Sequence, residues 1–303
     1  QGRVGRAALL ARLSDGIERT LTVVIAPAGF GKTTLLNEWC EVLRARRHVV
    51  GWLTLDHEDD DLQQFGAYVL ACLGQGGDSV AARAEALLHD DPLTPVATVV
   101  SVLLNDIARC GRQVFLVLDD FDRLSSRPIR ALVSRLLRYA PPNFHIALGV
   151  RGDPGLNLGE LQAHDRLLRI DADDLRFTSD DARAYFSQTG SVALDAPSVE
   201  LLNDATEGWV TGLQLAALAV RHADDAAKVA QEIASNRFGI DAYFENTVLA
   251  KLTPPMRQFA LRTSILDRLG PEVCDAIMGA GARSWDKLDW LEQRNMFLRA
   301  VDE

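Results

Sequence analysis

Short apolar runs with few polar interruptions recur through the first half of the chain, and each has the length of a β-strand. Such runs, rich in β-branched residues and bounded by turn residues, are typical of parallel strands that helices cover on both faces. The pattern predicts strands at residues 21–26, 49–56, 114–118, 145–150 and 167–171.

Helical periodicity fills the segments between these runs. Apolar residues follow Lys32 at the spacing of a helix with one buried face, namely Leu35, Leu36, Trp39, Cys40 and Leu43. Further helices are predicted at residues 62–73 and 127–139. Strands that alternate with helices predict an α/β fold with a right-handed, parallel, three-layer αβα sheet.

From residue 176 onward the pattern is helical throughout. Thr178 and Asp181 have the spacing of a capping box that opens a first helix. Pro254 and Pro255 follow the stretch LAKLT, where one helix is expected to break and the next to begin. Helices are predicted at residues 198–205, 209–221, 225–234, 241–251, 254–262, 271–278 and 285–293.

The composition predicts a soluble, globular protein with a large core. Of its 303 residues, 48% are hydrophobic, and its length corresponds to about two to three domains. No apolar run approaches the ~18 residues of a membrane span, and no signal peptide opens the chain, so we expect a cytoplasmic location and no membrane partner. Because the chain runs from Gln1 to FLRAVDE, we interpret it as a piece of a longer protein.

Residue spacing argues against disulfides and a metal site, and charge argues against a nucleic-acid contact. The four cysteines form no C-x-x-C pair and the six histidines no H-E-x-x-H pair, so we predict neither a disulfide framework nor an intrinsic metal site. A net charge of -10 argues against this segment as the main nucleic-acid contact. The stretch LRARR at residues 43–47 is either a local basic patch or, as we favour, a solvated helix end.

The stretch TVVIAPAGFGKTTLL, residues 22–36, carries the chemistry of a phosphate cradle. It matches the P-loop pattern G-x-x-x-x-G-K-[ST], except that Ala26 replaces the first glycine. In such a loop the glycines turn backbone amides toward phosphate, the lysine neutralises the β- and γ-phosphates, and the hydroxyl ligates Mg²⁺. The candidate nucleotide-binding residues are Ala28, Gly29, Phe30, Gly31, Lys32, Thr33 and Thr34.

Two adjacent carboxylates supply the second half of the predicted site. In VFLVLDDFDRL, residues 114–124, Asp119 and Asp120 come directly after a strand. We predict that Asp119 joins Thr33 in orienting the magnesium ion, and that Asp120 polarises an attacking water as general base. The alternative is a strand that ends in an aspartate-rich turn.

Two further strand ends carry polar candidates. Arg151 follows the strand at 145–150, where it either senses the γ-phosphate or caps the strand toward solvent. Asp56 begins the acidic stretch DHEDDD, which is more often a solvated loop than a metal site, although this strand end lies within reach of the nucleotide's surroundings.

Several stretches together resemble the MalT-like branch of the STAND signal-transduction ATPases, which are large ATP-binding regulators of the LuxR type. The stretches keep the family's order along nearly the whole chain; they are VVIAPAGFGKTTLLNEW, GWLTLDHEDDDLQQFGAYVLACL, VFLVLDDFDRL, LRFTSDDARAYF, TEGWVTGLQLAALAV and FENTVLAKLTPPMRQFALRTSILDRL. In that family alanine or serine often begins the P-loop. The resemblance therefore implies that Ala26 is a tolerated variant.

The resemblance also implies roles for individual residues. Lys32 and Thr33 take the Walker A role, Asp119 and Asp120 the Walker B role, and Arg151 the sensor role. In VGRAALLARL, Val4 and Arg6 are expected near adenine, and in EGWVTGLQL, Gly208 and Trp209 are expected at a hinge that touches the nucleotide. Relatives often carry histidine where this chain has Asp122, so the role of that position stays open.

The family architecture implies three parts: a P-loop nucleotide-binding domain at 1–175, a small helical domain at 176–238 and a truncated winged-helix domain at 239–303. The cofactors are ATP or ADP with Mg²⁺. We expect a regulatory switch of a signal-responsive transcriptional activator, which ADP holds closed, and which ATP and an unidentified inducer open for self-association. Slow ATP hydrolysis resets it, and DNA contacts belong to a C-terminal domain absent from this chain.

Two other classes of function are weighed against the switch. One is a P-loop ATPase with substantial turnover, stimulated by nucleic acid, but no aromatic and basic groove for a strand is evident in the sequence. The other is an interaction scaffold with a vestigial P-loop that binds no nucleotide.

Overall fold

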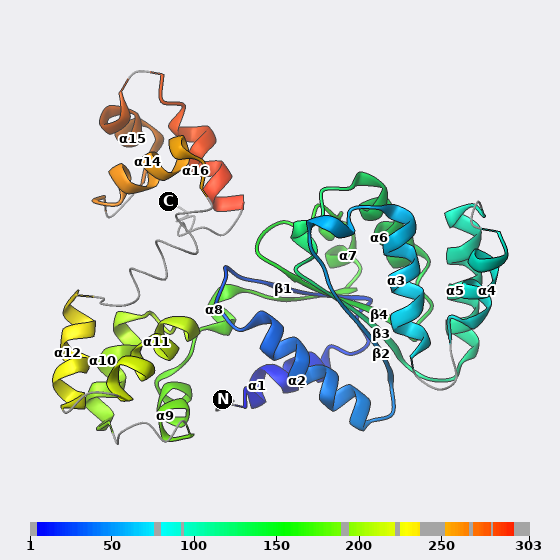
Figure 1. Ribbon diagram of the computed structural model, residues 1–303, viewed down its shortest axis with the longest axis horizontal. Helices are drawn as coiled ribbons and strands as arrows, with labels where there is room; N and C mark the ends of the chain where they lie inside the picture. Colours follow the sequence, from blue (N-terminus) through cyan, green and yellow to red (C-terminus); the bar gives the residue numbers. More distant parts are fainter. Residues whose placement is uncertain are drawn as a thin grey trace. The chain divides into compact units, whose positions relative to one another are not determined.

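The computed structural model describes residues 5–75, 80–91, 94–188, 194–221, 225–236, 252–266, 269–279 and 281–293. The chain divides into two compact units, Arg6–Leu175 and a second formed by the described residues from Arg176 onward (Figure 1). Throughout the described ranges, no helix combines the length and apolar character that crossing a membrane requires.

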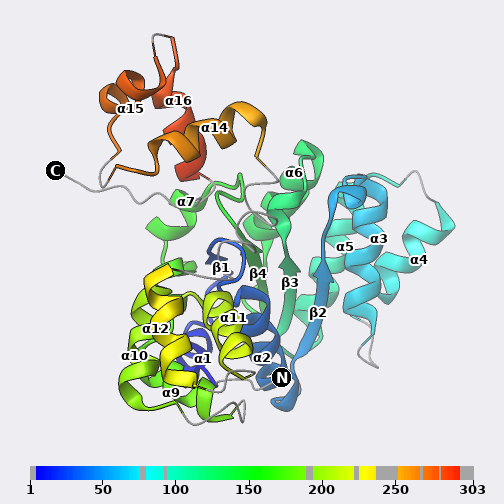
Figure 2. The same cartoon turned by 60° about the vertical axis from the view of Figure 1, so that its left-hand side comes forward.

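A five-stranded parallel sheet forms the centre of the first unit. Its strands are β1 (Leu21–Ile25), β2 (Val49–Thr54), β3 (Val114–Asp119), β4 (Phe144–Val150) and β5 (Leu167–Ile170), which confirms the predicted strands. The order across the sheet is β2-β3-β4-β1-β5, and Figure 2 shows β1, β4, β3 and β2 side by side in this sequence. Since β1 pairs with β4 on one side and β5 on the other, the strand order reverses at β1, where open α/β sheets bind their ligands.

Helices cover both faces of this sheet. The helices of this unit are α1 (Ala7–Asp15), α2 (Lys32–Ala45), α3 (Leu62–Gly74), α4 (Ala82–Asp90), α5 (Val96–Arg109), α6 (Arg127–Tyr139), α7 (Leu158–Ala163) and α8 (Ala172–Leu175), with short 3₁₀ turns η1 (His57–Asp59) and η2 (Phe121–Arg123). The predicted helices at 62–73 and 127–139 and the helix after the P-loop are confirmed.

Alternating side chains of the strands build two separate cores. In β3, Leu116 and Leu118 belong to the core beneath α3, α5 and α6, whereas Phe115 and Val117 belong to the core beneath α1 and α2. On the second side Trp39 of α2 meets Phe115 edge to face, with ring centroids 5.5 Å apart. The near-continuous apolar runs in the sequence arise because both faces of each strand are buried.

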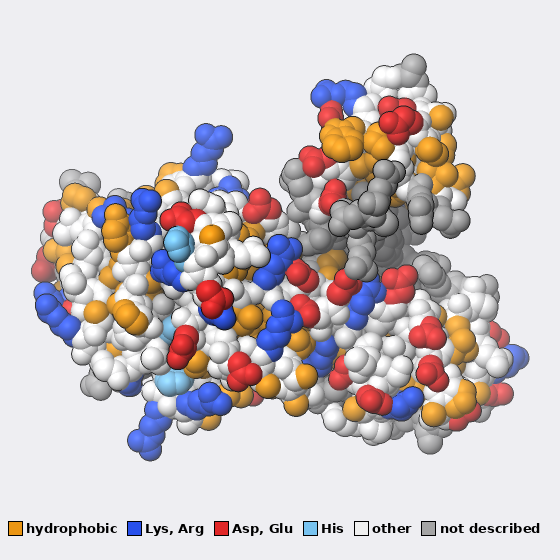
Figure 3. Space-filling view, turned by 180° about the vertical axis from the view of Figure 1, so that it is seen from behind, with side chains coloured by type: hydrophobic (Ala, Val, Ile, Leu, Met, Phe, Trp, Pro, Cys, Tyr) orange, Lys and Arg blue, Asp and Glu red, His pale blue; other side chains and the backbone are white. Residues whose placement is uncertain are grey.

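The exposed surface mixes charges of both signs. In Figure 3, Lys and Arg side chains alternate with Asp and Glu side chains over the visible face. The stretch LRARR ends α2: Arg44 lies in the last turn, and Arg46 follows as the C-terminal cap. Arg44, Arg46 and Arg47 are exposed, which fits a solvated helix end and leaves the alternative of a local basic patch open.

In the second unit the described elements are all helical. The helices α9 (Ser179–Gln188), α10 (Ala196–Ala205), α11 (Val210–Arg221) and α12 (Ala226–Asn236) share one core, and α14 (Pro254–Thr263), α15 (Pro271–Met278) and α16 (Ser284–Gln293) share another. The predicted helix at 241–251 lies outside the described residues. The capping box is confirmed, because the Thr178 N–H donates to Asp181 at 3.0 Å and the Asp181 N–H donates to Thr178 at 3.2 Å.

Candidate nucleotide-binding site

The predicted P-loop joins the carboxyl end of β1 to the first turn of α2. Gly29 and Gly31 have φ angles of 81° and 84°, a left-handed backbone that side chains other than glycine rarely adopt. Gly31 is also the N-cap of α2. The loop therefore needs glycine at these two positions, and it brings backbone amides and the positive helix end to one place.

Ala26, which replaces the first glycine of the pattern, continues the sheet. Its N–H donates to the Val150 carbonyl of β4 at 3.1 Å, and its side chain is fully buried. Its φ is not positive, unlike those of Gly29 and Gly31. Alanine therefore satisfies the backbone here, and the departure from the pattern leaves the loop intact.

Lys32 is buried at the start of α2. Its Nζ donates to the carbonyl oxygens of Ala26 and Pro27, at 2.7 and 3.0 Å, and only 6% of the residue is exposed. Burial, followed by the positive charge of Arg151, lowers the pKa of Lys32 to about 8, although nearby aspartates oppose the shift. An anionic ligand would restore the lost charge stabilisation.

The affinity for a polyphosphate ligand is expected to fall as the pH rises above 8. The lowered pKa of about 8 means that Lys32 of the free protein loses its proton above this pH, whereas a bound phosphate favours the protonated amine. Each pH unit above 8 then weakens binding by up to about tenfold, and binding takes up a proton. Calorimetric titration of ADP between pH 7 and 9.5, in buffers with different ionisation enthalpies, measures the affinity and the number of protons taken up. An affinity that does not change with pH, with no proton uptake, would contradict a contact between Lys32 and phosphate.

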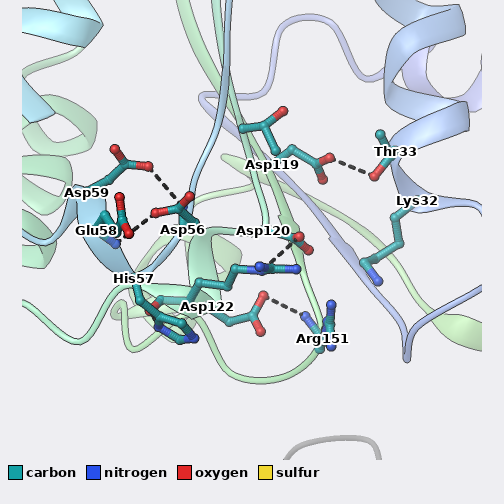
Figure 4. A network of polar contacts seen from close by, with 12 residues as sticks. Lys32, Thr33, Asp56, His57, Glu58, Asp59, Asp119, Asp120, Asp122 and Arg151 are labelled. Atoms are coloured by element: carbon teal, nitrogen blue, oxygen red, sulfur yellow. Dashed lines mark hydrogen bonds and ion pairs between the residues drawn. The ribbon is translucent and has the colours of Figure 1, made fainter. Parts of the chain in front are cut away.

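Thr33 and Asp119 place two side-chain oxygens next to each other beside the P-loop. The Thr33 hydroxyl donates to Asp119 Oδ2 at 2.6 Å (Figure 4). Asp119 is 1% exposed, its Oδ1 is buried without a hydrogen-bond partner, and burial raises the pKa of its carboxyl. A buried unpaired carboxylate oxygen is costly, and Mg²⁺ prefers oxygen ligands. The two residues therefore fit the magnesium ion that accompanies a nucleotide.

Gly149 of β4 makes room for this carboxylate. A Cβ atom at Gly149 would lie 2.3 Å from Asp119 Oδ1 and 3.1 Å from a methyl group of Leu36. Sequence reasoning did not identify Gly149 as part of the site. The available signal was a glycine inside the apolar strand HIALGV, since such a glycine often marks a close approach.

Asp120 follows β3 in a left-handed backbone conformation. Its φ and ψ are 56° and 34°, a region that residues other than glycine adopt infrequently, although aspartate does so more readily than most. Its Oδ2 forms an ion pair with Arg123 Nε, at a distance of 3.0 Å. Asp119 and Asp120 therefore differ, because one faces Thr33 and the other is held by a guanidinium group.

Arg151 lies at the end of β4, and Asp122 supports it. The Arg151 backbone N–H donates to Asp122 Oδ1 at 3.0 Å (Figure 4). Asp122, whose role the sequence left open, thus ties η2 to the carboxyl end of β4. The side-chain charge of Arg151 contributes to the lowered pKa of Lys32, so Lys32 and Arg151 lie in the same site.

The acidic stretch after β2 is a capped loop. Asp56 Oδ1 accepts the Glu58 N–H at 2.7 Å, and the Asp56 N–H donates to Asp59 at 2.9 Å. Asp60 accepts the backbone N–H groups of Ser125 and Ser126, at 2.9 and 2.8 Å. These contacts fit the interpretation of the stretch as a solvated loop. The sequence did not predict the hydrogen bonds by which the loop after β2 is joined to the loop after β3.

The remaining candidates are distributed between the two units. Arg6 donates to the carbonyl oxygens of Leu175 and Asp174, at 2.8 and 3.0 Å, within the first unit, and Val4 lies outside the described residues. Ala28 belongs to the P-loop, Phe30 packs partly against the core beneath α1 and α2, and Thr34 is exposed in the first turn of α2.

Gly208 and Trp209 belong to the second unit. The Gly208 carbonyl accepts the Phe177 N–H at 2.9 Å, and the Trp209 N–H donates to Thr206 at 2.9 Å, directly before α11. The contacts described at Gly208 and Trp209 thus lie inside their own unit, and their role at the nucleotide stays a prediction.

Two protein-family models match parts of this chain. Residues 4–148 match the AAA ATPase domain family, and residues 244–303 match the MalT winged helix domain family. The HTH-type transcriptional regulator MalT of Klebsiella pneumoniae strain 342 is 28% identical over 305 residues, an alignment that covers 99% of this chain and 33% of the relative. MalT of K. pneumoniae subsp. pneumoniae strain MGH 78578 matches with the same identity and coverage. The chain thus spans about a third of the length of these relatives.

Two solved structures share the fold. A Walker-type ATPase of Pyrococcus abyssi superimposes with a TM-score of 0.63 at 14% identity, over 97% of this chain and 90% of the other. A STAND protein with a tetratricopeptide repeat sensor from Pyrococcus horikoshii superimposes with a TM-score of 0.52 at 13% identity, over 97% of this chain and 39% of the other. The chain thus matches an AAA ATPase domain and, after it, a MalT winged helix domain, and it is similar to the regulator MalT along 99% of its own length.

Proposed function

We propose that this chain is the ATP- and ADP-binding switch of a signal-responsive transcriptional activator. The observation that carries the proposal is the buried, unpaired Oδ1 of Asp119 beside the Thr33 hydroxyl. Such an oxygen destabilises a protein that never binds a cation there. With Lys32 buried at the same strand ends, the arrangement supports binding of a nucleotide together with Mg²⁺.

Each residue of the site has a role in this proposal. The P-loop amides from Ala28 to Thr34 and the ammonium group of Lys32 hold the β- and γ-phosphates. Thr33 and Asp119 hold the magnesium ion, which neutralises phosphate charge. Arg151 senses the γ-phosphate, and its backbone is already positioned by Asp122.

We place the division into three parts at residues 1–175, 176–238 and 239–303. ADP holds these parts closed, and ATP with an inducer opens them for self-association. The relatives named above are HTH-type transcriptional regulators, so we assign DNA contacts to the part of such a protein that its alignment with this chain does not cover. The helices of the second unit, with Gly208 and Trp209 at the start of α11, report on the nucleotide.

Hydrolysis resets the switch. The oxygen of a water molecule forms a bond to the γ-phosphorus, the bond from that phosphorus to the bridging oxygen breaks, and ADP leaves with that oxygen. Asp120 takes the proton of the attacking water. We expect this reaction to be slow and to reset the state of the switch.

The test identifies the bound nucleotide and its effect. One sample of the purified protein is denatured, and the nucleotide that it releases is identified by chromatography. For a second, native sample, the mass and shape of the protein with ADP or with Mg²⁺–ATP are compared by analytical ultracentrifugation. We expect retained ADP, and a larger frictional ratio or mass with ATP. Rapid ATP turnover stimulated by DNA would instead indicate the turnover ATPase, and the absence of any bound or bindable nucleotide would indicate the scaffold.

A further inference from the structure

A groove with a volume of about 740 Å³ runs between α6 and α7 in the first unit, and this volume lies in the range of small-molecule sites. Each of its two walls is one face of a helix. Ser134, Arg135 and Arg138 line it from α6, and Asn157, Leu161 and His164 line it from α7 and its N-cap.

The deepest part of the groove is apolar. Leu137 and Leu161 are buried and Leu156 is partly buried, whereas the polar side chains of both walls are exposed. A ligand that enters the groove therefore meets leucine side chains below and polar groups around its rim.

Positive charge predominates among the residues that line the groove, all of which the structure describes. Arg135, Arg138 and Arg166 line it, against a single acidic residue, Glu160. The whole chain carries a net charge of -10, so the groove has the opposite sign to the rest of the molecule. A hollow lined by one sign of charge concentrates ligands of the other sign.

Two of these arginines have no carboxylate partner. Arg166 is partly buried, and its guanidinium group donates to the Thr20 hydroxyl and the Leu137 carbonyl, both at 2.9 Å. Within the described residues, neither Arg166 nor Arg138 forms an ion pair. Arg138 also favours the C-terminal end of α6, but Arg166 lies in no helix. A partly buried guanidinium group held only by neutral oxygens is stabilised by an anion.

Tyr139 adds an aromatic ring to the same groove. The residue is 57% exposed, and Arg135 Cζ lies 5.3 Å from the centroid of its ring. This cation–π contact orients the guanidinium group through its flat face. Leucine, tyrosine and arginine side chains together suit a ligand that joins an apolar ring to an oxyanion.

The groove lies away from the P-loop. Arg166 contacts Thr20, which directly precedes β1, whereas the P-loop follows the carboxyl end of the same strand. The two sites thus belong to opposite ends of β1, and none of the P-loop residues lines the groove.

We propose that this groove is a second ligand site, which binds a small organic anion separately from the nucleotide. Leu156 and Leu161 contact the apolar body of the ligand, and Arg138 and Arg166 hold its phosphate or carboxylate group. The forked donors of a guanidinium group fit either oxyanion. The site is independent of the proposed function, because it uses no residue assigned to the nucleotide.

The test uses 1-naphthyl phosphate as the probe, because it joins a flat apolar ring to a phosphate group. Isothermal titration calorimetry with the unchanged protein is expected to give a dissociation constant below about 1 mM, as for a ligand of this size. The uncharged analogue 1-naphthol should bind at least about tenfold more weakly, since it lacks the charge-assisted hydrogen bonds.

Two variants change the groove at exposed residues of α6. Arg138→Gln removes a positive charge, and Ser134→Glu adds a negative one. We expect each to weaken binding of the probe at least about tenfold. Circular dichroism and melting temperatures verify that each variant is folded.

Two control variants leave the groove unchanged. Arg127→Gln removes the same charge from an exposed residue at the start of α6 that does not line the groove. Lys32→Ala removes the cation of the P-loop. Both should bind the probe within about twofold of the unchanged protein, since charges outside the groove are screened by solvent and salt.

Four results would overturn the inference. They are no binding of the probe at millimolar concentrations, equal binding by Arg138→Gln and Arg127→Gln, and loss of binding in Lys32→Ala, which would assign the probe to the P-loop. The fourth is tighter binding of a single-stranded DNA oligonucleotide that Arg138→Gln abolishes, which would indicate a nucleic-acid contact instead.

Discussion

Replacing Lys32 with alanine is expected to weaken the binding of both ATP and ADP by at least about 100-fold, or about 3 kcal/mol. The ammonium group is held between the carbonyl oxygens of Ala26 and Pro27, at the loop that is expected to receive the phosphates. Because Lys32 itself is buried, solvent screens its charge weakly, and the loss of that charge affects a polyphosphate strongly. Equilibrium titration with fluorescently labelled nucleotides measures the effect.

Lys228→Ala is the matched control for this experiment. Lys228 is one of only four lysines in the chain, and it is exposed on α12 in the second unit. The same substitution there should leave nucleotide affinity within about twofold, because an exposed charge is screened by solvent and salt. Equal binding by the unchanged protein and Lys32→Ala would remove the P-loop from the proposed function.

The second large effect is expected from Gly149→Ala. The added methyl group would lie 2.3 Å from Asp119 Oδ1 and 3.1 Å from Leu36. The carboxylate, tied to Thr33 at 2.6 Å, has to move, or β4 has to shift. Overpacking of this kind destabilises a protein by about 1–3 kcal/mol. We expect a lower melting temperature together with loss of the Mg²⁺-dependent part of nucleotide affinity, measured by thermal unfolding and by titration with and without Mg²⁺.

Gly66→Ala is the control for an added methyl group. Gly66 lies within α3, and apart from its chain neighbours and the nearby backbone of α3, no described atom lies within 4 Å of a Cβ built there. Alanine in a helix interior is favoured over glycine by about 1 kcal/mol, so this variant should be equally stable or more stable, with unchanged magnesium dependence. If Gly149→Ala behaved in the same way, Asp119 would not need the space that Gly149 leaves.

The strands, the P-loop and the helix after it are predictable from sequence because their signals are local. Val23 and Val24 lie in a run that is buried on both faces of the sheet, which produces continuous apolar character. Gly31, Lys32 and Thr33 are adjacent, and the chemistry of a phosphate cradle depends on that adjacency. Asp119 is predictable for a related reason, since it follows a buried strand directly and parallel strands end at one edge of the sheet.

The contacts between distant loops were not predictable in the same way. Asp122 meets the backbone of Arg151, His57 meets Arg123, and a Cβ at Gly149 would meet Asp119, although these partners are far apart in the chain. No spacing rule relates them, because their distance depends on the order β2-β3-β4-β1-β5. That order also decides that the loop after β2 lies beside the loop after β3.

The sequence by itself thus determined the α/β class, the phosphate-binding loop and the carboxylates that accompany it, because periodicity and neighbouring residues encode them. Only the tertiary structure decided which partner each carboxylate has. Asp119 lies against Thr33 with one oxygen unpaired, and Asp120 lies against Arg123. The physical reason is that a side chain's partner depends on the packing of the whole sheet and its loops, which a local pattern does not contain.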